Sequence, residues 1–354
     1  MHIGIPKEIK PLENRVSLLP GAVNELSRQG HSISVQAGAG LGSGYSDQDY
    51  IDAGASLVSD AEALYANAKL IVKVKEPIQA DLDYLRADHI LFSYLHLAAL
   101  PLLTKQLQEI GLTAIGFETV EVDNRLPLLA PMSDIAGRLA GQIGAQLLQK
   151  PQGGKGLLLG GLAGTERGQV VILGGGVAGS SAALVSAALG AQVTIFDRNR
   201  DKLSQLRALG ANVTSLYSYS DAIAEAVSRA DLLIGAILVT GQRATQLVSE
   251  QMVKRMQAGS VIIDIAVDQG GCIETTRPTD YHDPTFMFHD VVHFGVTNMP
   301  GAVPKSASQA LSSALYPWVS RLAEDGWRND RQLTEAINVD GGKICHPALK
   351  NHKD

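Results

Sequence analysis

Short apolar runs alternate with longer amphipathic stretches along the whole chain. An apolar run of strand length followed by a helix-length amphipathic stretch is typical of a β–α unit, and repeated units form a largely parallel sheet. In the first part of the chain this pattern predicts helices such as Pro20–Gln29 and Ala98–Ile110. The strands predicted around them are Ile3–Pro6, Ser32–Gln36, Leu70–Lys75, Ile90–Leu95 and Thr113–Phe117.

The later part of the chain contains a second, compact series of strand-like runs, most of them separated by helical segments. A complete doubly wound dinucleotide-binding fold has six such strands, and this series supplies the same number. The predicted strands are Gln169–Leu173, Gln192–Phe196, Asn212–Leu216, Leu232–Ala236, Ser260–Asp264 and Val291–Val296.

A long helix is predicted between the two series. Ser133 has the character of an N-cap, and the helix would run from it to about Leu148. Gly137, Gly141 and Gly144 lie along this helix. Because glycine weakens a helix, we expect these positions to allow another element to pack very close.

The length of 354 residues and the two strand series predict an α/β protein with two Rossmann-like doubly wound domains. A further helix, Ser306–Glu324, is expected to return to the first domain and to be followed by a polar tail. The dinucleotide-binding domain (129–304) would then be inserted into a substrate domain made of residues 1–128 and 305–354.

Composition and charge exclude several classes of function. The formal net charge of -6 argues against a nucleic-acid-binding protein, because phosphate binding needs a concentrated basic surface. No apolar run reaches the roughly 18 residues that would span a membrane. The start of the chain lacks the pattern of a secretory signal, and two cysteines, Cys272 and Cys345, do not make a disulfide framework. We therefore expect a cytoplasmic protein.

The segment from Gly174 to Gly179 carries the pattern G-x-G-x-x-G between a predicted strand and a predicted helix. In a dinucleotide-binding turn, Gly174 would allow the tight turn, Gly176 would let the backbone approach a pyrophosphate, and Gly179 would let helix and strand pack closely. The helix N-terminus would then offer N–H groups to the phosphates.

The next predicted strand leads into Asp197, close to the spacing at which this fingerprint places an acidic residue. A carboxylate there accepts hydrogen bonds from the ribose hydroxyls and repels a 2′-phosphate, which favours NAD over NADP. Arg198 follows directly, and an arginine near this place can accept a 2′-phosphate. The preference for NAD therefore stays open on these residues alone.

Polar residues follow several predicted strands, where ligands bind in open α/β sheets. Arg15 could hold a carboxylate through two parallel hydrogen bonds, and Lys75 could polarise a keto oxygen. His96 could transfer protons near neutral pH. Together with Asp268 and a nicotinamide, this set suits redox chemistry on a small 2-amino or 2-hydroxy acid.

A metal site is not expected. His282, His289 and His293 lie near one another in the sequence, but no cysteine or carboxylate accompanies them at metal-ligand spacing. Asp264 lies inside a predicted strand and is interpreted as structural.

Long motifs in this chain resemble those of a known family. Ile3–Lys10 and Glu13–Val16 are similar to the opening of alanine dehydrogenases and their transhydrogenase relatives. Asp264–Thr275 and Val292–Pro304 are closer to alanine dehydrogenases. The resemblance covers nearly the whole chain and implies the reversible reaction of L-alanine, water and NAD to pyruvate, ammonium and NADH. It also implies a homo-oligomer, commonly a hexamer in this family.

The resemblance also implies roles for individual residues. Arg15 would bind the substrate carboxylate, and Lys75 the carbonyl side. His96 would act as acid and base, and Asp268 would handle water or proton transfer during hydrolysis of the imine. In addition to the fingerprint glycines and Asp268, the residues expected around NAD are Ser133, Asp197, Lys202, Ser218, Leu238, Val239, Ile265, Asn298 and Met299.

Three alternatives remain at this stage. The chain could be the nucleotide-binding subunit of a proton-pumping transhydrogenase, which shares the opening motif but serves a membrane partner. A non-catalytic NAD-sensing protein would keep the glycines and Asp197 but would not need Arg15, Lys75, His96 and Asp268 together. A dehydrogenase for a lysine-type amino acid would need room for a long charged side chain.

Overall fold

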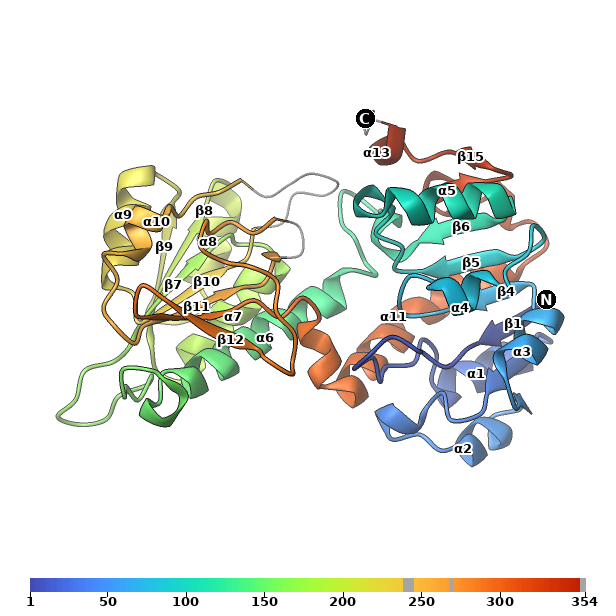
Figure 1. Ribbon diagram of the computed structural model, residues 1–354, viewed down its shortest axis with the longest axis horizontal. Helices are drawn as coiled ribbons and strands as arrows, with labels where there is room; N and C mark the ends of the chain where they lie inside the picture. Colours follow the sequence, from blue (N-terminus) through green and yellow to red (C-terminus); the bar gives the residue numbers. More distant parts are fainter. Residues whose placement is uncertain (238–244, 268–269, 351–354) are drawn as a thin grey trace. The chain divides into compact units, whose positions relative to one another are not determined.

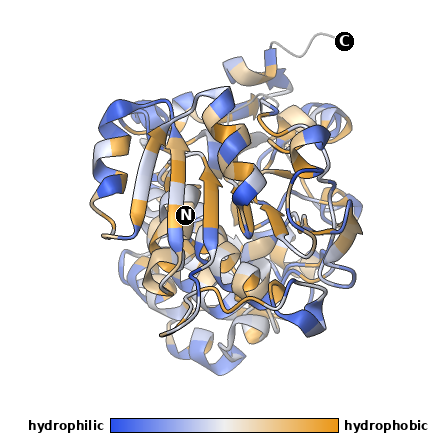
Figure 2. Ribbon diagram, turned by 90° about the vertical axis from the view of Figure 1, so that its left-hand side faces the viewer, coloured by the Kyte–Doolittle hydropathy of each residue, from blue (hydrophilic) through white to orange (hydrophobic). Residues whose placement is uncertain are grey.

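The computed structural model describes residues 1–237, 245–267 and 270–350, and the chain divides into two compact units. The terminal unit consists of Met1–Met132 and Gly301–Asp354, and the inserted unit of Ser133–Pro300. In Figure 1 the terminal unit combines the blue and cyan start of the chain with its red end, whereas the inserted unit runs from green to orange. Hydrophobic residues gather on the strands in Figure 2, and hydrophilic residues lie mainly on helices and loops.

The sheet of the terminal unit has the strand order β15-β14-β6-β5-β4-β1-β2-β3. Strands β1 to β6 are parallel, and their order reverses direction between β1 and β4. Strands β14 and β15 extend one edge in antiparallel fashion. The strands are β1 (His2–Ile5), β2 (Ser32–Gln36), β3 (Ser56–Val58), β4 (Leu70–Val72), β5 (Ile90–Ser93), β6 (Thr113–Gly116), β14 (Ile337–Asp340) and β15 (Lys343–Ile344).

Helices surround this sheet. On one face of the sheet, residues of α3 and α5 pack in an apolar cluster with Ile71, Leu91 and Ala114. These three are strand residues, and their neighbours along each strand point to the other face. The helices are α1 (Pro20–Arg28), α2 (Asp47–Asp52), α3 (Ala61–Asn67), α4 (Gln79–Leu82), α5 (Pro101–Ile110), α11 (Pro304–Ala323), α12 (Arg331–Glu335) and α13 (Pro347–Lys350). Short 3-10 helices are η1 (Leu41–Ser43), η2 (Leu97–Ala99), η3 (Phe117–Thr119) and η7 (Trp327–Asn329).

The inserted unit has a sheet of order β12-β13-β11-β10-β7-β8-β9. All neighbours are parallel except β12, which pairs antiparallel with β13. The strands are β7 (Gln169–Leu173), β8 (Gln192–Asp197), β9 (Val213–Tyr217), β10 (Leu232–Gly235), β11 (Val261–Asp264), β12 (Thr285–Phe288) and β13 (Val291–Phe294). The helices are α6 (Ala130–Leu147), α7 (Val177–Ala188), α8 (Arg200–Arg207), α9 (Ser220–Arg229) and α10 (Glu250–Val253), with short 3-10 helices η4 (Lys150–Gln152) and η6 (Met299–Ala302).

Both sheets therefore have the doubly wound α/β fold expected from the sequence. The predicted strands are confirmed to within a few residues, but β3, β12, β14 and β15 were not predicted. Strands β3, β12 and β15 lie at sheet edges and are partly exposed, so they lack the fully apolar runs that mark predicted strands such as β4. Strand β14 alternates apolar and polar residues over only four positions, which is too short for a periodic pattern to stand out. The expected polar tail is wrong in part, because Ile337–Asp340 forms β14 and pairs with β6.

The prediction for Ser133 as an N-cap is wrong. Helix α6 begins at Ala130, so Ser133 lies within its first turn. Pro131 is compatible with this earlier start because a proline in the first helical turn lacks only an N–H group that has no partner there. The prediction of close packing along this helix is confirmed. A Cβ on Gly137 would lie 2.0 Å from the Ala178 carbonyl oxygen, and one on Gly144 would lie 2.4 Å from Leu232.

Candidate active site

The carboxyl edge of the inserted sheet is the first candidate region. Numbered along the chain, its six parallel strands follow the order 3-2-1-4-5-6 of a dinucleotide-binding fold, with the reversal between β7 and β10. Ligands bind in the crevice outside the carboxyl ends of the strands at such a reversal. The segment Gly174–Gly176 follows β7, and Ala236 follows β10, so both lie at this place.

The three fingerprint glycines differ in their surroundings. Gly174 has φ +100°, and a Cβ there would lie 2.6 Å from the Ala236 carbonyl oxygen. A Cβ on Gly179 would lie 1.8 Å from the Gly174 carbonyl oxygen, so α7 and the turn are in direct contact. A Cβ on Gly176 would meet nothing within 4 Å. The space beside Gly176, at the N-terminus of α7, is therefore open to a phosphate group.

Asp197 ends β8 beside this turn. One of its carboxylate oxygens accepts a hydrogen bond from the Gly175 N–H (2.7 Å), and the other accepts from the Asn199 N–H (2.8 Å). The carboxylate thus braces the glycine turn and lies at the sheet edge where a ribose is expected.

The other residues expected around NAD occupy several elements. Lys202 lies on α8, Ser218 follows β9, Ile265 follows β11, Asn298 and Met299 follow β13, and Ser133 lies on α6. Ile265 donates its N–H to the Gly235 carbonyl (2.8 Å), which holds the ends of β10 and β11 together. Leu238 and Val239 lie outside the described residues, as does Asp268.

The carboxyl edge of the terminal sheet is the second candidate region. Arg15 follows β1, Lys75 follows β4 and His96 follows β5, and these three strands are neighbours in the sheet. Helix α11 fixes the segment that carries Arg15. The Ser308 hydroxyl accepts from the Val16 N–H, and the Ser312 hydroxyl accepts from the Leu19 N–H, both at 2.9 Å.

Arg15 is buried and paired with Glu13. The Arg15 Nε donates to Glu13 Oε1 (2.7 Å), and Nη2 donates to Oε2 (2.5 Å). Burial opposes the charged form, but the hydrogen bonds and charge of Glu13 outweigh it and raise the pKa of Arg15 above its usual value. The Nη1 atom lies 3.2 Å from the Met132 sulfur, a weak acceptor. Glu13 thus holds a permanently charged guanidinium in one orientation, as a carboxylate clamp requires.

A buried ionic network lies next to Lys75. Lys73 is 1% exposed and pairs with Asp81 (3.0 Å) and Glu8 (3.5 Å). Burial would lower the pKa of Lys73, but the two carboxylates raise it, so the ammonium stays charged. Glu8 also accepts from the backbone N–H groups of Val74 (2.6 Å) and Lys75 (3.4 Å). The network therefore fixes the backbone from which the Lys75 side chain extends to Glu76, 3.7 Å away.

His96 has an unusual backbone and is half-buried. Its φ is +48°, and its ring stacks on the Tyr94 ring with centroids 5.9 Å apart. The Tyr94 hydroxyl donates to the Leu128 carbonyl (2.6 Å), and burial raises the pKa of that hydroxyl. Sequence reasoning proposed His96 but did not propose the buried residues that contact Arg15, His96 or the backbone of Lys75, or that pair with those residues, namely Glu8, Glu13, Lys73, Asp81, Tyr94 and Glu118. A charge inside an apolar strand was the available signal for Lys73.

Asp264 braces the segment that leads from β11 to Asp268. Its carboxylate accepts from the Ala266 N–H (3.2 Å), the Cys272 N–H (3.1 Å) and the Thr276 hydroxyl (2.9 Å). Burial raises the pKa of Asp264 to about 6, against the effect of these hydrogen bonds. The structural role predicted for Asp264 is confirmed by these contacts.

The Asp264 carboxyl should make stability depend on pH. Its pKa is raised from 3.8 to about 6, so its stabilising contribution is complete below pH 3.8 and is lost as the pH rises through 6. The shift of about two units corresponds to roughly 3 kcal/mol. Denaturant unfolding should therefore show the wild type losing about this much relative to Asp264→Asn between pH 4 and 7. The exposed Asp283→Asn is the control, and a pH-independent difference for Asp264→Asn would contradict the expectation.

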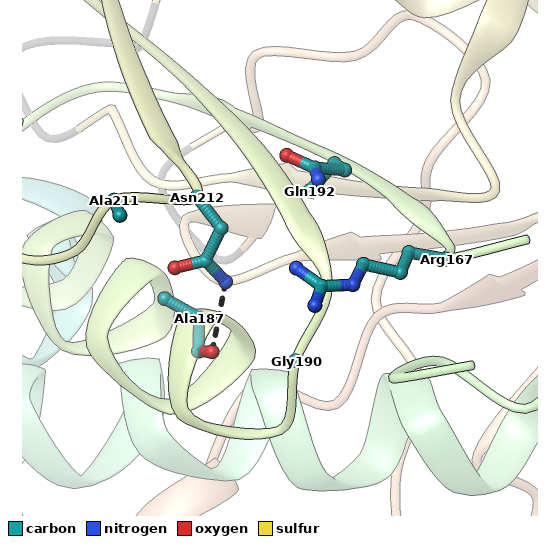
Figure 3. Close-up of a pocket in the computed structure, with 6 residues that line it drawn as sticks. All are labelled: Arg167, Ala187, Gly190, Gln192, Ala211 and Asn212. Atoms are coloured by element: carbon teal, nitrogen blue, oxygen red, sulfur yellow. Dashed lines mark hydrogen bonds between the residues drawn. The ribbon is translucent and has the colours of Figure 1, made fainter. Parts of the chain in front are cut away.

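One surface hollow in the inserted unit lies away from these edges. It is lined by Arg167, Ala187, Gly190, Gln192, Ala211 and Asn212 (Figure 3). Arg167, Gln192 and Asn212 lie at or just before the starts of β7, β8 and β9, so the hollow is at the amino edge of the sheet. The Asn212 amide there donates to the Ala187 carbonyl (2.9 Å).

Two of the three histidines considered for a metal have other side-chain partners. His293 is fully buried and hydrogen-bonds Thr275 (2.8 Å), whereas His289 contacts Glu250 (2.8 Å). Within residues 1–237, 245–267 and 270–350, no group of three or more His, Cys, Asp or Glu side chains could hold a metal ion.

In the same ranges no helix is long and apolar enough to cross a bilayer.

The chain matches known proteins along its whole length. The models for the N-terminal and C-terminal domains of alanine dehydrogenase/PNT match residues 4–136 and 140–347. The alanine dehydrogenase of Bacillus subtilis is 47% identical over 99% of this chain and 94% of its own length. A solved L-alanine dehydrogenase is 51% identical, with a TM-score of 0.95 over 99% of this chain and 98% of that one. A transhydrogenase structure from Sinorhizobium meliloti is 26% identical, with a TM-score of 0.84 over 98% and 100% of the two chains.

Proposed function

The chain belongs to the alanine dehydrogenase/PNT family, and we propose that it catalyses the NAD-dependent, reversible oxidative deamination of L-alanine to pyruvate and ammonium. One observation carries this proposal in the structure. The terminal unit collects an orientated guanidinium, a lysine and a histidine at the ends of neighbouring strands, while the inserted unit carries a glycine turn with open space at Gly176.

The inserted unit suits a dinucleotide. The N-terminus of α7 would hold the pyrophosphate beside Gly176, because its first N–H groups have no partners within the helix. Asp197 would accept the ribose hydroxyls. We place Gly174, Gly179, Ser133, Lys202, Ser218, Leu238, Val239, Ile265, Asp268, Asn298 and Met299 around the rest of the cofactor.

The terminal unit would bind the substrate. Arg15 would take the alanine carboxylate, since its guanidinium is held charged by Glu13. Lys75 would bind the carbonyl oxygen of pyruvate and orient the carbon that reacts. NAD, when bound, supplies the nicotinamide that accepts a hydride from the alanine Cα.

Hydrolysis of the resulting imine needs proton transfers. His96 would take a proton from the water that adds to the imine carbon and return one to the departing ammonia. Asp268 would assist as the second proton carrier. The balanced products are pyruvate, ammonium, NADH and one proton.

The direct test uses purified protein, NAD and a panel of L-amino acids, with NADH formation followed by absorbance and each assay repeated with NADP. We expect turnover with L-alanine and NAD, slower turnover with other small amino acids and little with NADP. A difference of one methylene is worth only about 1–3 kcal/mol, so discrimination among small side chains should be incomplete. Inactivity on every amino acid despite measurable NAD binding would favour a transhydrogenase-like or NAD-sensing protein. Preference for a lysine-type substrate would support the third alternative.

The proposal extends to assembly and location. By resemblance to the family we expect a homohexamer in the cytoplasm that needs no metal, membrane or nucleic-acid partner. Light scattering on the purified protein would measure the subunit number, and a monomer would contradict this expectation.

A further inference from the structure

The conformation of His96 is the starting observation. His96 lies between β5 and η2, with φ +48° and ψ +34° in the left-handed region. Residues other than glycine adopt this region rarely, and they do so when their surroundings hold them there. Because φ and ψ at His96 set the direction of its Cβ, whatever holds this backbone also aims the imidazole.

Glu118 is the group that holds this backbone. Its carboxylate accepts from the His96 N–H (2.6 Å) and from the Leu95 N–H (3.1 Å to Oε1 and 3.2 Å to Oε2). Glu118 lies on η3 at the end of β6, and β6 is the parallel neighbour of β5. Two consecutive backbone N–H groups therefore donate to one carboxylate at the end of the adjacent strand. Such charge-assisted hydrogen bonds are stronger than those between neutral groups.

The rings beside His96 support the same orientation. Tyr94 stacks on the imidazole with an angle of 9° between the planes, and Phe117, next to Glu118, packs edge-on against Tyr94 with centroids 4.9 Å apart. His96 is thus held by an aromatic stack from one side and through its backbone by Glu118.

We infer that Glu118 is a positioning residue for His96, acting through the backbone amides of Leu95 and His96 and not as a proton carrier. This inference rests on the proposed function of His96 as the acid and base. The carboxylate keeps the His96 backbone in its left-handed conformation, and the imidazole is directed toward the substrate in consequence.

The titratable groups around Glu118 define the controls. His346, half-buried in the segment before α13, is close enough for the Glu118 charge to raise its pKa, against the larger lowering by burial. Glu121 also affects His346 and is exposed. The charge of Glu118 raises the pKa of the Tyr94 hydroxyl, whereas the charge of Arg15 lowers it. Glu121→Gln therefore removes a nearby negative charge without touching the Leu95 and His96 amides.

The experiment compares wild type, Glu118→Gln, Glu118→Asp, Glu121→Gln and His346→Gln. Glutamine keeps the size of the side chain but has one acceptor oxygen, and aspartate keeps the charge but is one methylene shorter. We expect kcat for L-alanine to fall roughly 10- to 100-fold in Glu118→Gln and less in Glu118→Asp, as small misplacements of catalytic groups do. The KM for NAD should stay unchanged, and the pH profile of kcat/KM should shift. Glu121→Gln and His346→Gln should match the wild type in both respects.

Hydrogen exchange provides a readout that needs no activity. The amides of Leu95 and His96 should exchange slowly in the wild type and in Glu121→Gln, and faster in Glu118→Gln. Unchanged exchange in a folded Glu118→Gln protein would overturn the inference, as would faster exchange with wild-type kcat and pH profile. If Glu118→Gln does not fold, hydrogen exchange and steady-state kinetics of Glu118→Asp test the inference in its place. A wild type that is inert on alanine would refute the proposed function, while the exchange data would still decide whether Glu118 holds the His96 backbone.

Discussion

The His96→Ala variant is expected to turn over L-alanine roughly 10²–10⁴ times more slowly than the wild type, the range for loss of a general acid–base group. The physical reason is that adding water to the imine and releasing ammonia both need a proton carrier near neutral pH. The loss should lie in kcat, because His96 belongs to the terminal unit and the glycine turn to the inserted unit.

Steady-state kinetics and NAD binding together check this expectation. His282→Ala is the matched control, since His282 is exposed and only its backbone N–H, which alanine keeps, donates to the Asp280 carboxylate in the contacts of the described residues. NAD should bind His96→Ala and wild type equally well. Near-normal turnover of His96→Ala with NAD bound would show that another group carries the protons.

Two glycine-to-alanine changes three residues apart should differ strongly in their effect on stability. Gly179→Ala would place a methyl group 1.8 Å from the Gly174 carbonyl oxygen, so helix and turn must separate. We expect the free energy of unfolding to fall by about 3 kcal/mol, at the upper end of overpacking effects. Gly176→Ala meets no atom within 4 Å, and Gly176 has φ -72°, which alanine adopts without strain. Its stability should change by less than about 0.5 kcal/mol.

The affinity for NAD distinguishes the role of Gly176 in phosphate binding from that of Gly179 in packing. The methyl group of Gly176→Ala would occupy the space in which the backbone approaches a pyrophosphate. The Kd for NAD should therefore rise at least about tenfold, equivalent to roughly 1.4 kcal/mol, in a protein that folds normally. Calorimetric titration measures the Kd and denaturant unfolding the stability. If Gly176→Ala binds NAD as the wild type does, the pyrophosphate is not bound at this turn.

Local patterns were sufficient to predict most of the fold. The apolar runs at Val170–Leu173 and Val261–Ile263 identify central strands, because a strand covered on both faces buries the residues of both faces. The short strand β14 has no comparable signal. Its four residues became a strand only because β6 offers a free edge for antiparallel pairing. The sequence predicts the start of α6 at Ser133, because serine is a common N-cap, whereas the helix begins at Ala130 and Ser133 lies inside it.

Residue type and motif spacing were enough to nominate the chemistry of Arg15, Lys75, His96 and the glycine turn, because each of these groups would act through its own side chain or backbone. The groups that support them were decided by tertiary structure. Glu118, which accepts from the Leu95 and His96 N–H groups, would have its function only through contacts at one sheet edge. Glu118 and His96 lie 22 positions apart in the sequence, yet the parallel pairing of β5 and β6 brings them to 2.6 Å. A linear pattern carries no record of strand neighbours, and only the folded sheet order determines which carboxylate meets which backbone.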